Sequence, residues 1–160
     1  MPGAVFMQLK NFALTLAAYL PLITCSVQAK NLTIVDPAGK PVVNAVVSVT
    51  SDSTPSAGTA VMDQVDKQFV PHVLAVPAGT SVTFPNSDNI RHHVYSFSQA
   101  KPFEIKLYSG LSADPVEFDK PGIVALGCNI HDQMIGYVYV YENARVFITG
   151  SDGSVVIPDG

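Results

Sequence analysis

Three residues with soft ligand atoms lie at a spacing of three in the segment GCNIHDQM: Cys128, His131 and Met134. A thiolate, an imidazole and a thioether together favour copper that alternates between Cu(I) and Cu(II). One tight loop can turn all three side chains toward a common centre. The spacing therefore predicts most of a copper site, which still lacks a second histidine.

The second histidine is expected from another strand. A trigonal site of one cysteine and two histidines with a long axial methionine needs one ligand that fixes the loop to the body of the protein. Two adjacent candidates, His92 and His93, follow the segment PNSDNIR. Neighbouring residues of a strand point to opposite faces, so we expect only one of them to face the loop.

Each of these residues also has a simpler interpretation. A free cysteine can pack as a small apolar residue, and an isolated histidine or methionine is usually a surface or core residue. Their mutual spacing favours the metal site. His72 has no partner motif, so we expect a partly exposed strand residue. Asp132 and Glu104 have no partner spaced for acid–base hydrolysis, and we expect solvated charges.

The first 29 residues predict export. Lys10 precedes the apolar run FALTLAAYLPLITCSV, and small residues lead to a cut after Ala29, which is the pattern of a secretory signal peptide. An uncleaved membrane anchor and a lipidated Cys25 are the alternatives, although the run is short for spanning a bilayer. Cleavage would leave Cys128 as the one cysteine, which excludes an internal disulfide and favours a metal thiolate.

The rest of the chain, residues 30–160, is predicted to form one all-β domain. Charged residues make up 14% of the sequence and the formal net charge is -4, which argues against a disordered tail or a nucleic-acid binder. Short apolar runs alternate with Pro, Gly, Asn and Asp, as in a sandwich or barrel. The expected strands include QFVPHVLAV, TSVTF, HHVYSFS, FEIKLY, PVEFD, GIVALG and IGYVYVY.

Two further hairpins are expected at the ends of this domain. NLTIV and VVNAVVSVT flank a turn at residues 36–41, while ARVFITG and SDGSVVIP flank a turn at residues 150–153. Pro fixes φ and Gly permits positive φ in such connections. The polar stretch SDSTPSAGT between the first hairpin and the next strands is expected to be a surface loop.

Residues 64–141 resemble the cupredoxins, the plastocyanin- and amicyanin-like type 1 blue copper proteins. The resemblance covers QFVPHVLAVPAGTSVTFPNSD, then HHV, then LGCNIHDQMIGYVYV, with Asn86 six residues before His92. HHVYSFSQAKPFEIKLY and GCNIHDQMIGY are closer still to a group labelled methylamine utilization proteins. The N-terminal hairpin is similar to part of a carboxypeptidase regulatory-like β domain, an element without chemistry of its own.

The resemblance implies a Greek-key β-sandwich with one type 1 copper ion held by His92, Cys128, His131 and Met134. The family spacing from Asn86 selects His92, whereas strand parity favours His93, which shares a face with Tyr95. Other cupredoxins commonly have Asn at the position of His93. The family also implies that His131 passes the electron, with Ile130 and Ile135 in a small apolar docking patch.

We therefore expect a periplasmic one-electron carrier. Four protein ligands leave no open position for a small-molecule substrate, so an enzyme is not expected. Its partners would be redox proteins such as a cytochrome c or a periplasmic dehydrogenase, met transiently by a monomer. A periplasmic copper chaperone or storage protein is the alternative function, and a structural adhesion domain is a third.

Overall fold

The computed structural model describes residues 29–53, 55–110 and 114–158, and every regular element among them is a β-strand. The all-β prediction is therefore confirmed, and six of the seven strands expected between residues 68 and 141 are present as single strands. The seventh, QFVPHVLAV, is divided at Pro71 and His72 into two strands that join different sheets, because Pro has no N–H to donate to a strand partner. The strands are β1 (Ala29–Thr33), β2 (Val46–Thr50), β3 (Thr59–Val61), β4 (Asp63–Val65), β5 (Gln68–Val70), β6 (Val73–Pro77), β7 (Thr80–Thr83), β8 (His92–Ser96), β9 (Phe103–Tyr108), β10 (Val116–Phe118), β11 (Gly122–Gly127), β12 (Ile135–Tyr141), β13 (Ala144–Ile148) and β14 (Ser154–Pro158).

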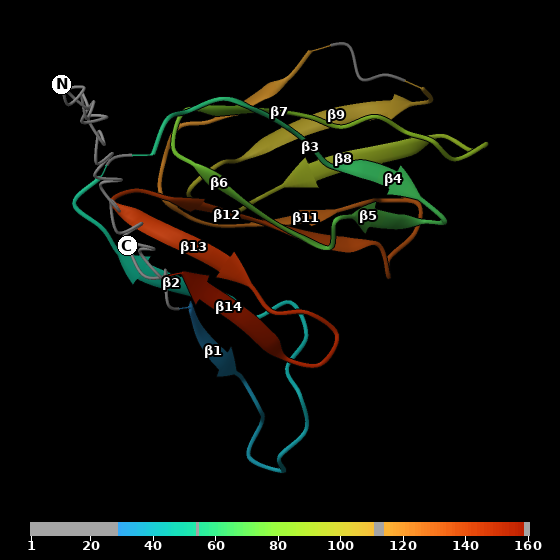
Figure 1. Cartoon of the computed structure of the whole chain (residues 1–160). Coiled ribbons are helices and arrows are strands. Elements are labelled where there is room, and N and C mark those ends of the chain that lie inside the picture. Colours follow the sequence, from blue (N-terminus) through green and yellow to red (C-terminus); the bar gives the residue numbers. More distant parts are fainter. Residues whose placement is uncertain (1–28, 54, 111–113, 159–160) are drawn as a thin grey trace, which may run out of the picture.

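Two sheets pack face to face to form a β-sandwich (Figure 1). One has five strands in the order β6-β12-β11-β8-β9, and the other has three in the order β10-β7-β3. Buried side chains alternate with exposed ones along β12, as expected when one face of a sheet meets a core. Val82 and Phe118 from the smaller sheet join Val94, Val124 and Val138 from the larger one in a single buried cluster.

The chain crosses between the two sheets in a Greek-key path. β8 and β9 pair as antiparallel neighbours, β10 then joins the three-stranded sheet, and β11 returns to lie beside β8. A fourth strand that returns beside the first defines the Greek key. The predicted Greek-key β-sandwich is thus the fold of this chain.

This topology gathers the candidate ligands at one end of the five-stranded sheet. β11 ends at Gly127 and β12 begins at Ile135, so residues 128–134 form the loop that joins two paired strands. Gly127 also pairs with Tyr95 of β8, and β8 begins with His92. The strand order therefore brings the loop and the candidate histidines together.

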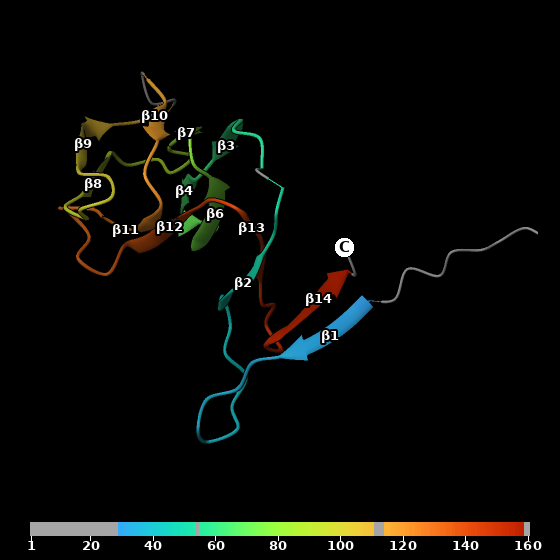
Figure 2. The same ribbon diagram turned by 90° about the vertical axis from the view of Figure 1, so that its left-hand side faces the viewer.

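The terminal strands lie where the sequence predicts them, but their partners differ from the two separate hairpins expected. β1 pairs with β14 and β2 with β13, both antiparallel, so each early strand joins a late one. Thr149 reinforces this link: its hydroxyl donates to Val42 O at 2.7 Å and accepts from Ala45 N at 2.9 Å. Figure 2 shows β1 and β14 side by side, away from the sandwich.

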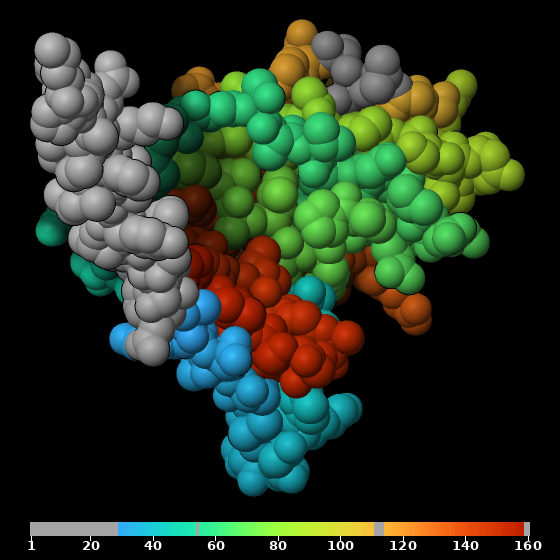
Figure 3. Space-filling model, in the orientation of Figure 1, coloured from blue at the N-terminus to red at the C-terminus, as the bar shows by residue number. Residues whose placement is uncertain are grey.

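The predicted signal peptide falls outside the described residues except for Ala29, the first residue of β1. Among the residues described, no helix is long and apolar enough to cross a membrane. The segment after β1, blue to cyan in Figure 3, projects beyond the body of the molecule at the end of the terminal strands.

Candidate metal centre

Three of the four predicted ligands come together in one cluster, in which His92 and Cys128 are buried and His131 is partly buried. The ligand atoms of His92, Cys128 and His131 all lie within 4.8 Å of one another, and this is the one such cluster in the described part of the chain. The Cys128 Sγ lies 3.8 Å from Nδ1 of His92, and the two imidazole rings are 5.1 Å apart between centroids. His92 is fully buried and Cys128 is 3% exposed.

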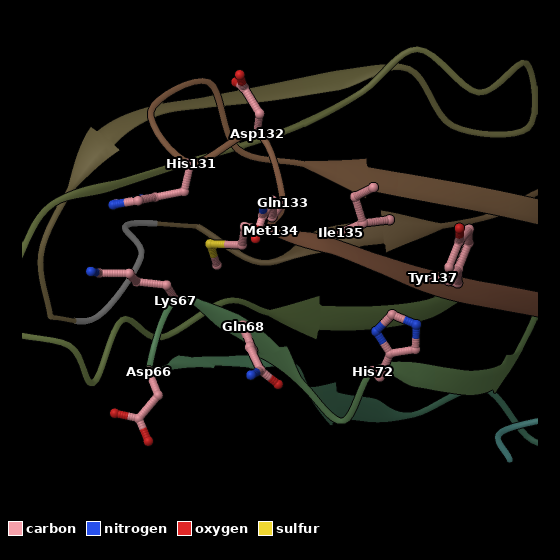
Figure 4. Close-up of a pocket in the computed structure, with 10 residues that line it drawn as sticks. All are labelled: Asp66, Lys67, Gln68, His72, His131, Asp132, Gln133, Met134, Ile135 and Tyr137. Atoms are coloured by element: carbon pink, nitrogen blue, oxygen red, sulfur yellow. The ribbon is translucent and has the colours of Figure 1, made fainter.

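The fourth predicted residue, Met134, is buried at the end of the same loop. Its backbone N–H donates to His131 O at 2.8 Å, which closes the turn between them. Met134 also belongs to the hydrophobic core cluster, which anchors this end of the loop. In Figure 4 the side chains of His131 and Met134 extend to the same side of the loop.

The structure places His92, not His93, beside the loop. His93 points to the opposite face, where its Nε2 lies 2.9 Å from Glu104 Oε1 and its ring contacts Tyr95 at 5.5 Å. The partner of Glu104 was missed by the sequence reasoning, which expected a solvated charge. The contact crosses from β8 to β9, and a sequence without known strand partners gives no signal for it.

The two imidazoles each have a nitrogen whose lone pair is available to bind a metal. Nδ1 of His131 is buried without a hydrogen-bond partner, although buried polar atoms normally have one. Nε2 of His92 lies 2.6 Å from Asp88 Oδ2, so its Nδ1 remains available on the side of Cys128. Two imidazole nitrogens, a free thiol and a nearby thioether fit copper better than magnesium or calcium, which prefer oxygen.

Asn86 braces the segment that leads to His92. Its Nδ2 donates to Ile90 O at 2.8 Å and to Tyr108 O at 2.9 Å, and its Oδ1 accepts from Asp88 N at 3.1 Å. Asn86 is itself 3% exposed. The sequence indicated Asn86 only through its spacing from His92, and the structure shows that it orders the intervening turn.

Asp88 links His92 to the turn between β4 and β5. Its Oδ1 accepts from Asp66 N at 2.7 Å, and its Oδ2 accepts from Lys67 N at 3.0 Å as well as contacting His92. Burial alone would raise the pKa of Asp88, but the hydrogen bonds from Lys67, His92 and Asp66 outweigh it and lower that pKa below its usual value. Asp88 is therefore a carboxylate at neutral pH. No pattern in the sequence indicated this role of Asp88.

Two pockets flank the ligand loop. One, of about 820 Å³, lies between the β4–β5 turn and the loop and is lined by His131, Met134, Lys67 and their neighbours (Figure 4). His72 lines the far end of this pocket and is in edge contact with Tyr137. It is exposed, as expected, but it lies in the bend between β5 and β6 and not within a strand. The other pocket, of about 510 Å³, is lined by Tyr95, Phe97 and Cys128.

Comparison with known proteins gives matches among solved structures alone. No protein-family model matches the chain, and no curated protein matches it. A copper-containing nitrite reductase from Thermus scotoductus SA-01 is 24% identical over 69% of this chain and 25% of its own, with a TM-score of 0.49. This chain thus spans a quarter of that protein's length.

Two smaller proteins are also similar. A reduced Cu(I) form of an amicyanin mutant is 21% identical over 59% of this chain and 98% of its own, with a TM-score of 0.48. A pseudoazurin from Sinorhizobium meliloti is 23% identical over 53% of this chain and 75% of its own, with a TM-score of 0.42.

Proposed function

We propose that this chain is a type 1 copper protein of the cupredoxin kind that carries one electron at a time between redox partners. The observation that carries the proposal is the cluster of His92, Cys128 and His131, in which all ligand atoms lie within 4.8 Å. A structural thiol would not require two imidazole nitrogens around it. Trigonal coordination by two histidines and a cysteine, with a weak axial methionine, is the arrangement of blue-copper electron-transfer sites.

In this proposal each residue has a defined role. Cys128 would supply the thiolate, Nδ1 of His92 and Nδ1 of His131 would supply the two nitrogens, and Met134 would supply a weakly bound thioether. Copper, when bound, alternates between Cu(I) and Cu(II) and so stores one electron. Both histidines bind metal only when neutral, so copper affinity falls as the pH is lowered. The burial of His92 and Cys128 keeps water away from the centre.

His131 is the proposed contact with partners, because it is the most exposed member of the cluster. Ile130 and Ile135, beside it, are 48% and 45% exposed and supply apolar contact area. A small apolar surface suits a monomeric carrier, which must release its partner after each transfer. The partners we propose are a cytochrome c or a periplasmic dehydrogenase, reached after cleavage of residues 1–29. Methylamine utilization names a group that the sequence resembles and identifies no substrate.

The same geometry favours a carrier over an enzyme. Four protein ligands fill the proposed coordination sphere, whereas catalytic metal sites keep a position open for substrate or water. Residues 30–160 form the proposed functional unit, with the copper-binding part in residues 64–141.

The proposal is tested by adding Cu(II) to purified residues 30–160 and recording the visible and electron paramagnetic resonance spectra. We expect an intense thiolate-to-copper charge-transfer band with one copper bound per chain. Cys128→Ser should abolish the band and His92→Ala should abolish or strongly weaken it, while His93→Ala serves as the matched control and should retain it. Absence of the band in the parent protein would refute the type 1 assignment.

Voltammetry separates electron transfer from copper handling. A carrier should give a reversible one-electron couple, because the buried ligands hold one geometry in both oxidation states. Bound copper without a reversible couple would favour the alternative, a periplasmic copper chaperone or storage protein.

A further inference from the structure

We infer that Asp88 is a positioning residue that fixes the orientation of His92 and ties this ligand to the β4–β5 turn. The inference concerns the folded protein with or without metal. Its consequence for copper rests on the function proposed above.

The contact between Asp88 and His92 selects one form of the imidazole. Asp88 Oδ2 lies 2.6 Å from Nε2 of a fully buried ring, and a carboxylate accepts hydrogen bonds but donates none. The proton of neutral His92 therefore resides on Nε2. Nδ1 then carries the lone pair and faces the Cys128 Sγ at 3.8 Å. A carboxylate behind a ligating histidine commonly sets its tautomer in this way.

The β4–β5 turn in its turn holds Asp88 in place. Asp66 and Lys67 have φ angles of 51° and 60°, the left-handed region that two-residue hairpin turns require and that Asn and Gly favour. Neither residue of this turn is Asn or Gly. The N–H groups of both donate to the Asp88 carboxylate, one to each oxygen. The carboxylate thus stabilises the turn. In return, the two N–H groups of the turn fix the orientation of the carboxylate, so that its Oδ2 faces Nε2 of His92.

The carboxylate also acts on copper through its charge. One of its oxygens contacts the imidazole of His92, which would ligate the metal, and the Asp88 side chain is only 12% exposed. Coulomb attraction across such a partly buried site favours the higher positive charge of Cu(II) over that of Cu(I). Loss of the carboxylate should therefore weaken Cu(II) binding more than Cu(I) binding and raise the reduction potential.

Asp88→Ala and Asp88→Asn separate the two contacts in the copper-free protein. Ala removes every acceptor, so we expect ¹⁵N NMR to show His92 as a mixture of tautomers and the Asp66 and Lys67 amides to exchange about tenfold faster or more. Asn can turn its one oxygen toward Lys67 and His92, so His92 should keep its tautomer and the Asp66 amide alone should exchange faster. Glu117→Gln is the control. It removes one negative charge, as Asp88→Asn does, but from an exposed residue of β10, so it should alter neither the His92 tautomer nor the exchange of the turn amides.

The copper measurements complete the test. We expect Asp88→Ala to lower Cu(II) affinity by about 10- to 100-fold, and both Asp88 variants to raise the reduction potential, with no such change in Glu117→Gln. Unchanged His92 tautomer and unchanged turn amides in Asp88→Ala would overturn the positioning role. If the parent protein bound no copper, the proposed function would fail, yet the NMR measurements on copper-free protein would still decide the role of Asp88.

Discussion

Two glycines flank the ligand loop under different packing constraints, and adding one methyl group to each should have unequal effects. A Cβ at Gly136, in β12, would lie 2.7 Å from the Cβ of Phe69 and 3.0 Å from its Cγ. The Phe69 Cβ moves only with the backbone of β5, and the ring attached to it is buried, at 1% exposure. A Cβ at Gly127 would lie 2.7 Å from Cζ and 2.8 Å from the hydroxyl oxygen of Tyr95, the far end of its ring.

The expected magnitudes follow from what can move. Overpacking a core costs about 1–3 kcal/mol, and replacing Gly by Ala returns about 0.4–1 kcal/mol through the unfolded chain. The Phe69 side chain is packed in the core and cannot move away from a new methyl group, so Gly136→Ala should lower the free energy of unfolding by about 2 kcal/mol. The Tyr95 ring borders a pocket of about 510 Å³ and can rotate into it. Gly127→Ala should therefore cost less than about 1 kcal/mol.

Urea denaturation of the copper-free protein measures both free energies of unfolding, with linear extrapolation to water. In a protein that already carries Tyr95→Ala, Gly127→Ala should lower the free energy of unfolding by less than it does in the parent protein, because the obstructing ring is then gone. If Gly136→Ala were as stable as Gly127→Ala, our account of rigid and movable contacts around the loop would be wrong.

Three further predictions concern residues around the site and on the surface. Asn86→Ala removes the side-chain donors from two part-buried carbonyl groups, those of Ile90 and Tyr108, and should lower the free energy of unfolding by about 2–4 kcal/mol in denaturant titrations. Asn86→Asp should destabilise the protein at least as much. Burial raises the pKa of Tyr108 to about 12. The stability that its neutral hydroxyl contributes is therefore complete below the ordinary pKa of 10.0 and is lost as the pH rises toward 12. In a pH titration followed by absorbance, Tyr108→Phe should remove the phenolate signal that appears near pH 12. The hydrogen bond from Lys101 lowers the pKa of Asp119, so Lys101→Gln should raise that pKa in an NMR titration, and the pair's contribution at neutral pH should disappear in acid.

The sequence predicts well the all-β fold and the close approach of Cys128 and His131, because both depend on short-range pattern. Alternating apolar residues indicate β12. Cys128, His131 and Met134 lie within seven residues of one loop, so their spacing in the sequence limits how far apart they can be in the structure. The resemblance to cupredoxins also selected His92, which lies beside Cys128 in the structure. Its role as a ligand remains a proposal.

What the sequence did not predict depends on contacts between distant segments. Asp88 was missed because its partners at residues 66 and 67 are more than 20 residues away and donate from the backbone, which leaves no trace in residue type. The pairing of β1 with β14 was missed for a related reason. Turn residues such as Gly153, at φ 71°, mark where the chain reverses but do not state which strand will be its neighbour.

The pairing of the first strands with the last also constrains the order in which the chain can fold. Thr149 bonds to Val42 and Ala45 across separations of 107 and 104 residues, so this connection closes a loop that contains the whole sandwich. Closure of so long a loop is favourable only after the intervening chain has become compact. As the chain emerges from the ribosome, β1 and β2 are made before β13 and β14, and they have no strand partners until those last strands are complete. Strand edges left open for that interval can pair with other chains, so the time before closure, more than the final stability, should set how strongly this protein aggregates during production.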